Sequence, residues 1–160
     1  MPDRLSGFAV TVDAYHTVRG HPEVRQAVTG LLEEVDLDDP AALEELSAAI
    51  RRRIEEVPLD EGVAAAVRAA YQRLCEHCEL DAVPVAVRSS ATSEDLPDAS
   101  FAGEHDTYLW VRGPDEVLRH LTRCWSSLFT ARAIAYRRGR GYEHDDDPAH
   151  RGERRSKKLH

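Results

Sequence analysis

One stretch of the sequence combines residue types that can bind an anion. Arg88 follows the apolar residues 85–87, and small hydroxyl residues come directly after it: Ser89, Ser90 and Thr92. A guanidinium group at the end of a strand can direct two parallel N–H donors at a phosphate or a carboxylate. The hydroxyl groups can donate further hydrogen bonds to the same anion. The stretch therefore predicts an anion-binding loop.

A glycine and two acidic residues in the same stretch leave two interpretations open. Gly103 has no side chain, so backbone N–H groups can approach an anion closely there. Glu94 and Asp95 offer the alternative, because either carboxylate can pair with Arg88 in an ordinary polar loop.

Two short apolar segments flank this loop and must position it. Residues 83–87 are typical of a buried strand, and residues 107–111 alternate in the manner of a second strand. Residues 7–12 alternate apolar and small polar side chains, which predicts a third.

Helix signals account for most of the remaining chain. Apolar residues recur at three- and four-residue spacing, acidic residues precede Pro40, Pro58 ends the helix that follows, and Asp60 caps the next one. The helices are expected from residue 22, over 40–57, over 60–78, and as one long helix over 113–138. The predicted fold class is α+β, with several helices packed on a small mixed sheet.

Length, charge and cysteine content exclude several classes of protein. The chain has 160 residues with 29 acidic and 21 basic side chains, which suits one acidic domain and disfavours nucleic-acid binding. No apolar run is long enough for a transmembrane helix, so no membrane partner is expected. Three cysteines are too few for a disulfide framework, which predicts a cytoplasmic protein.

The last residues differ in charge from the rest. Residues 149–160 carry five basic side chains and one acidic one, with almost no apolar residues. Such a segment cannot bury enough surface to fold. We therefore predict a folded domain over 1–147 and a basic, disordered tail over 148–160.

Two other polar clusters are interpreted as structural. Cys75 and Cys78 could share a zinc ion with His120 and Cys124, but their spacing is weak evidence for a metal site. Residues 51–53, three arginines within an acid-rich helix, are expected to form exposed pairs one helical turn apart.

The central stretch also resembles a known family. Residues 87–103, VRSSATSEDLPDASFAG, closely resemble the signature of the amino-terminal ATP-binding domain shared by phosphoenolpyruvate synthase, pyruvate phosphate dikinase and rifampin phosphotransferase. The likeness continues in residues 7–15, 106–113 and 123–137, and it covers about residues 5–143. It implies the first lobe of an ATP-grasp-like nucleotide-binding domain.

The resemblance implies a role for three residues. Arg88 matches an arginine that contacts the phosphates of ATP, and Gly103 matches a glycine in the loop that covers them. Thr107 matches a threonine that touches the phosphate tail. ATP and Mg²⁺ are thus the implied cofactors. Family members transfer phosphate from ATP, with release of AMP and phosphate, through a phosphohistidine on a separate domain.

Departures from the family pattern predict a truncated domain. Glu104 stands where the family usually has Gln, and Trp110 where a polar residue is usual. The lysine-containing Gly-Gly-Lys-Gly element is expected before Met1. The second half, with the adenine site and the metal ligands, is expected after Tyr142.

Three functional hypotheses follow from the resemblance. The chain could be an ATP-binding subunit that joins a separately encoded second half and phosphohistidine domain, with the apolar stripe of residues 117–129 and an exposed Trp110 as the interface. It could be a truncated, inactive paralogue. It could also bind a nucleotide without catalysis. The phosphate acceptor, pyruvate, a rifamycin or another compound, would be recognised by other domains.

Overall fold

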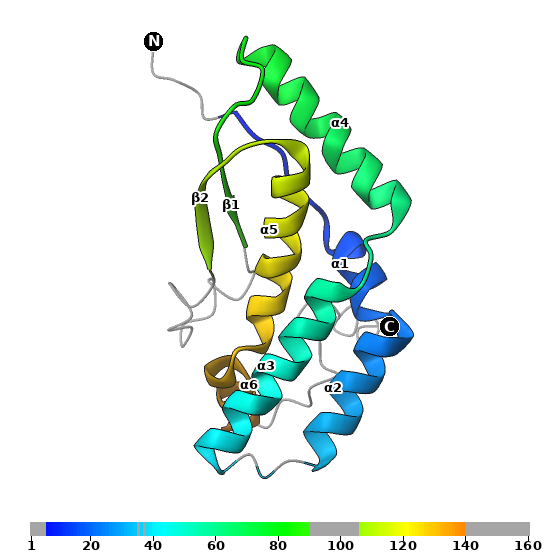
Figure 1. Cartoon of the computed structure of the whole chain (residues 1–160), viewed down its shortest axis with the longest axis vertical. Coiled ribbons are helices and arrows are strands. Elements are labelled where there is room, and N and C mark those ends of the chain that lie inside the picture. The colour runs from blue at the N-terminus through cyan, green and yellow to red at the C-terminus, as the bar shows by residue number, and fades with distance from the viewer. Residues whose placement is uncertain (1–5, 35, 37, 90–105, 140–160) are drawn as a thin grey trace, which may run out of the picture.

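The computed structural model describes residues 6–34, 36, 38–89 and 106–139 (Figure 1). Within these ranges it contains six α-helices, one short 3₁₀ helix and one two-stranded sheet. In chain order the elements are α1 (Val12–Arg19), α2 (Pro22–Glu34), α3 (Pro40–Glu56), α4 (Glu61–His77), β1 (Val85–Arg88), β2 (Thr107–Val111), α5 (Pro114–Ser126), η2 (Ser127–Phe129) and α6 (Ala131–Gly139). The α+β class is confirmed in this coarse sense.

Two helix starts confirm the expected capping chemistry. The carboxylate of Asp39 accepts a hydrogen bond from the backbone N–H of Ala41 at 2.9 Å, and Pro40 occupies the first turn of α3. Asp60 accepts from the N–H of Val63 at 3.1 Å at the start of α4. Each side chain supplies an acceptor to a donor that has no partner within its helix.

The sheet is smaller and simpler than predicted. Strands β1 and β2 pair antiparallel, with Val85 opposite Val111 and Arg88 opposite Thr107, so the expected mixed sheet is wrong for the described residues. The expected strand over 7–12 is also wrong, because residues 7–11 join no ladder and α1 begins at Val12. Alternating side chains favour an extended backbone, but a strand also needs a hydrogen-bonding neighbour.

The predicted long helix over 113–138 is divided into α5, η2 and α6. Thr130 is extended, with φ −62° and ψ 152°, and interrupts the helical ladder. Its hydroxyl accepts from the N–H of Ala133 at 3.2 Å, which caps α6. The side chains of Ser126 and Ser127 donate to carbonyl oxygens three residues earlier, Arg123 and Cys124. Such bonds compete with the regular helical pattern, so the apolar spacing alone does not keep the helix continuous.

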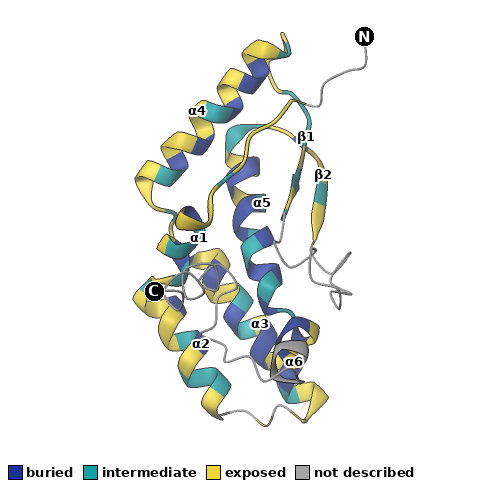
Figure 2. Ribbon diagram, turned by 180° about the vertical axis from the view of Figure 1, so that it is seen from behind, coloured by how far each residue is buried: buried dark blue, intermediate teal, exposed yellow. Residues whose placement is uncertain are grey.

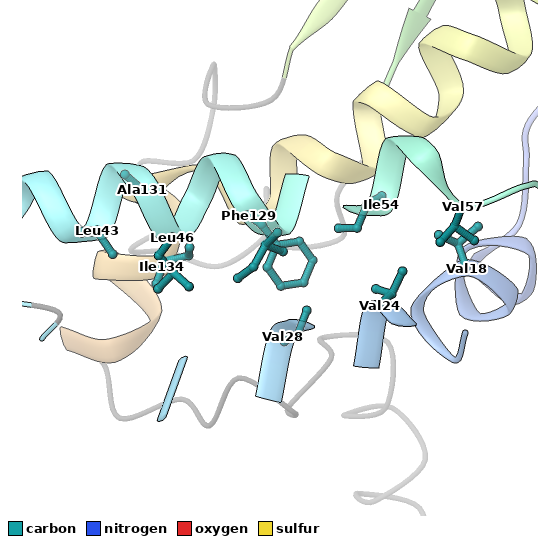
Figure 3. Close-up of a cluster of buried hydrophobic side chains, with 11 residues drawn as sticks. Val18, Val24, Val28, Leu43, Leu46, Ile54, Val57, Phe129, Ala131 and Ile134 are labelled. Atoms are coloured by element: carbon teal, nitrogen blue, oxygen red, sulfur yellow. The ribbon is translucent and has the colours of Figure 1, made fainter. Parts of the chain in front are cut away.

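The buried apolar residues form two clusters that meet at Trp125 of α5. The first joins α2, α3 and α6 around Phe129, whose ring Figure 3 shows between α3 side chains and Val28 of α2. The second joins α4, α5 and the sheet, and Trp125 packs against both. Figure 2 shows the buried stripe along α5. This stripe, including Val117 and Leu121, is buried within the chain itself, so it is not the partner interface expected from the sequence.

One buried tyrosine ties one end of the sheet, where β1 begins and β2 ends, to α4. The hydroxyl of Tyr71 donates to the carbonyl oxygen of Val83 at 2.8 Å and accepts from the N–H of Gly113 at 2.8 Å. Val83 precedes β1, and Gly113 follows β2. Burial raises the pKa of Tyr71, so the hydroxyl stays protonated and can serve both bonds.

We predict that Tyr71→Phe lowers the free energy of unfolding by about 1–3 kcal/mol, because it leaves a partly buried carbonyl and a partly buried N–H without their partner. Urea denaturation followed by circular dichroism measures the change. The exposed Gln72→Ala, on the solvent side of the same helix, is the control. Equal midpoints for Tyr71→Phe and the unchanged chain would contradict the prediction.

Candidate functional site

The structure brings two of the three residues predicted to bind the phosphates of ATP, Arg88 and Thr107, close together. Arg88 ends β1 and Thr107 begins β2, and the two are direct partners in the antiparallel ladder. Side chains at paired positions project from the same face of a sheet, and both of these are exposed. Gly103 and Glu104 lie outside the described residues, as do the candidate pairing residues Glu94 and Asp95.

The sheet has a covered face and an open face. Val85, Val87, Tyr108 and Val111 pack against the cluster formed with α4 and α5. Arg88 and Thr107 occupy alternate positions and therefore project from the opposite, open face. Figure 1 shows the sheet on one side of α5, with α4 and α1 on the other. A ligand could thus approach the two residues without displacing any described helix.

The open face also carries two large apolar side chains. A β-bulge places Leu109 and Trp110 opposite the single residue Ala86, and they are 64% and 76% exposed. Trp110 has a φ of 60°, a left-handed conformation that is costly for a bulky residue. The exposure expected for Trp110 is confirmed, and its contact with a partner remains a prediction.

Arg88 is available to bind an anion as far as the described residues show. It forms no ion pair with any of them.

Two of the three arginines of α3, by contrast, reach other parts of the chain. Arg53 lies 3.4 Å from Glu23 of α2, and Arg51 lies 4.0 Å from Asp106. These two arginines therefore link elements, in place of the pairs one helical turn apart that the sequence suggested.

A polar network lies beneath Thr107, on the covered side of β2. The hydroxyl of Tyr108 donates to the Asp106 carboxylate at 2.9 Å, and the Arg123 guanidinium lies 5.0 Å from the Tyr108 ring centre. The ring of His120 lies 4.8 Å from the same ring. Sequence reasoning missed this network. Its only sequence signal is that Asp106 and Tyr108 flank Thr107 at a spacing of two, which puts both on one face.

The network changes the acidity of two groups. Burial, together with the hydrogen bond to Asp106 and its charge, raises the pKa of Tyr108 to about 12. Burial and the charge of Asp106 raise the pKa of the Cys124 thiol to about 11. Both groups are therefore neutral at physiological pH, and Tyr108 is a hydrogen-bond donor.

The cysteines do not assemble a metal centre in the part of the chain described. Cys75 and Cys124 are buried, Cys78 is half-buried, and none of the three is in a disulfide. Over residues 6–34, 36, 38–89 and 106–139, no three His, Cys, Asp or Glu side chains gather in a way that could hold a metal ion.

Over the same residues, no helix is both long and apolar enough to cross a membrane.

Comparison with known proteins identifies similar sequences. Residues 4–148 match the family described as pyruvate phosphate dikinase, AMP/ATP-binding domain. The chain is 48% identical over 138 residues to a rifampicin phosphotransferase of Streptomyces sviceus, and 46% identical over 137 residues to a probable phosphoenolpyruvate synthase of Methanocaldococcus jannaschii. It is 42% identical over 138 residues to a phosphoenolpyruvate synthase of Helicobacter pylori.

These matches cover most of this chain and a small part of each relative. Each spans 86% of the chain, but only 15%, 12% and 17%, respectively, of the three relatives. The chain thus corresponds to less than a fifth of the length of these proteins.

We expect Trp110→Asn to raise the free energy of unfolding by about 1 kcal/mol, since Asn tolerates the left-handed conformation better and little packing is lost at an exposed position. Thermal denaturation measures the change. Leu109→Asn, which places the same residue on the same face at a position without positive φ, should not stabilise. A lower midpoint for Trp110→Asn would contradict the expectation.

The raised pKa of Tyr108 predicts a loss of stability at alkaline pH. The unfolded chain ionises this phenol near pH 10, whereas the folded chain keeps it neutral to about pH 12. The contribution of Tyr108 is therefore complete below about pH 10 and disappears as the pH rises to about 12. Ultraviolet titration of phenolate absorbance should show a late phase to which Tyr71, whose pKa is also raised, contributes as well, and Tyr108→Phe should reduce its amplitude by one phenol. A late phase of unchanged amplitude in this variant would count against the assignment.

Proposed function

Since the chain belongs to the pyruvate phosphate dikinase AMP/ATP-binding domain family, we propose that it binds ATP with the phosphate tail over the open face of the β1–β2 sheet. The observation that carries this proposal is the pairing of Arg88 with Thr107. A cation and a hydroxyl, both exposed and side by side on one face, are the groups that a polyphosphate needs.

Each residue has a distinct part in the proposed site. Arg88 would donate two parallel N–H bonds to phosphate oxygens and offset their charge. Thr107 would donate its hydroxyl or its N–H to the tail. Gly103, outside the described residues, would supply a backbone N–H at close range. We propose no Mg²⁺ ligands among the described residues, because none of them form a suitable cluster.

We propose that this binding serves phosphoryl transfer from ATP, with release of AMP and phosphate. The support comes from relatives whose names are phosphoenolpyruvate synthase and rifampicin phosphotransferase. ATP supplies the phosphoryl group when it is bound. In such reactions positioning and charge neutralisation provide most of the catalysis, and Arg88 is suited to both.

A second candidate function is nucleotide binding without transfer by this chain alone. The observation that favours it is the short span of the match, between 12% and 17% of the three relatives. The two candidates differ in one measurement, the release of AMP from ATP by the purified chain. Release that Arg88→Ala abolishes would favour transfer, and saturable binding without release would favour the second candidate.

The test of nucleotide binding is calorimetric titration of the chain with Mg²⁺–ATP. We predict that Arg88→Ala raises the dissociation constant by about 10- to 100-fold, because a hydrogen bond to a charged group contributes about 1.5–3 kcal/mol. Arg73→Ala, which removes an exposed arginine from α4, should leave the constant unchanged. Arg88→Lys keeps the charge and should recover only part of the affinity.

Equal affinity for the unchanged chain and Arg88→Ala would overturn the role of Arg88. No saturable binding by the folded chain would overturn the proposed function itself.

A further inference from the structure

We propose that Asp106 and Tyr108 are positioning residues that hold Thr107 and the adjoining end of β1 in place for the phosphate tail. The proposal rests on the proposed function of Arg88 and Thr107. It adds a role for two side chains that lie on the covered side of β2 and would not contact the ligand themselves. Its basis is the network on the covered side of β2 described above.

The first step is the alternation of side chains along β2. Asp106 and Tyr108 lie immediately before and after Thr107, and the hydrogen bond between them at 2.9 Å places both on the same side of the backbone. Thr107 projects from the other side. The backbone on each side of Thr107 is therefore attached to the covered face, while its hydroxyl faces outward.

The second step is the attachment of Asp106 to two helices. Its carboxylate lies 4.0 Å from the Arg51 guanidinium of α3. Its backbone carbonyl accepts from the thiol of Cys124 of α5 at 3.7 Å. Asp106 directly precedes Thr107, the first residue of β2, so these contacts hold the point at which the strand begins.

The third step is the packing of Tyr108 against α5 and β1. Its ring lies 5.0 Å from the Arg123 guanidinium and 4.8 Å from the His120 ring, both from α5. Across the sheet it pairs with Val87, the residue before Arg88. Tyr108 is thus adjacent to Thr107 along its own strand and to the end of β1 across the ladder.

These contacts have a consequence for binding. A short two-stranded sheet is marginally stable by itself, so its ends fray unless side chains hold them. If the ends were free, ATP would have to order Arg88 and Thr107, and the entropy cost would weaken binding. Fixing β2 on both sides of Thr107 removes this cost before the ligand arrives.

The experiment is a double-mutant cycle on Mg²⁺–ATP affinity in the full chain. Tyr108→Phe keeps the ring and removes the hydrogen bond to Asp106, and we expect it to raise the dissociation constant about fivefold. Thr107→Val removes the hydroxyl that is to be positioned. If Tyr108 acts through Thr107, then Tyr108→Phe in the Thr107→Val background adds no more than about twofold.

A second pair of variants separates the charge of Asp106 from its hydrogen bond. Asp106→Ala and Asp106→Asn both remove the negative charge, but Asn keeps an oxygen that can accept from Tyr108. We expect Asp106→Asn to retain most of the affinity that Asp106→Ala loses. Equal affinities for the two variants would overturn the proposal.

Tyr71→Phe is the matched structural control. It also removes a buried hydroxyl from the sheet region, but its two bonds lie at the opposite end of the ladder, next to Val83 and Gly113. We expect lower stability with unchanged ATP affinity for the folded molecules, and additive effects with Thr107→Val.

The outcomes separate the two proposals. Full additivity of Tyr108→Phe and Thr107→Val, with Arg88→Ala still weakening binding, would overturn the positioning role and leave the proposed function standing. Absence of saturable Mg²⁺–ATP binding to the folded chain would overturn the proposed function, and the positioning role with it.

Discussion

The packing of α5 is the constraint on which the rest of the structure depends. This helix contacts α3, α4 and both strands. The sheet has only two strands, too few to be stable without a supporting layer. Its covered face therefore depends on the apolar side chains that α5 contributes, among them Val117 and Leu121. The open face keeps its orientation relative to the helices because the covered face of the same sheet packs against α4 and α5.

The same dependence explains why polar groups gather at the end of the sheet. The covered face carries the apolar side chains of Val85, Val87 and Val111. Where β2 begins, the residues on this face are Asp106 and Tyr108, which are hydrogen-bonded to each other. A half-buried phenol needs a hydrogen-bond partner, and the carboxylate of Asp106 provides it. Arg51 of α3 lies 4.0 Å from this carboxylate, and Arg123 of α5 lies against the phenol ring. The candidate site thus combines hydrogen-bonded residues on the covered face of the sheet with the exposed guanidinium of Arg88 on the open face.

Local signals in the sequence predicted much of the architecture. Asp39 with Pro40, Pro58 and Asp60 predicted the start of α3, its end and the start of α4, because capping and proline effects act within a few residues. The strand over 107–111 was predicted with its bounds. The strand over 7–12 and the unbroken helix over 113–138 were wrong. The first needs a neighbouring chain segment, and the second is interrupted by the hydroxyl bonds of Ser126, Ser127 and Thr130, which compete with the helical pattern.

The sequence by itself determined the family, through residues 87–103 and the segments around them, and it identified Arg88 and Thr107 as candidates. Only the tertiary structure decided that these two are cross-strand partners on one open face, since the register depends on how both strands pack against α5. It also decided that Asp106, Tyr108, Arg51 and Arg123 form one network. Arg51 and Arg123 come from α3 and α5, and no local spacing relates them to Asp106 and Tyr108. Local chemistry fixes caps and turns, whereas contacts between distant segments require the folded chain.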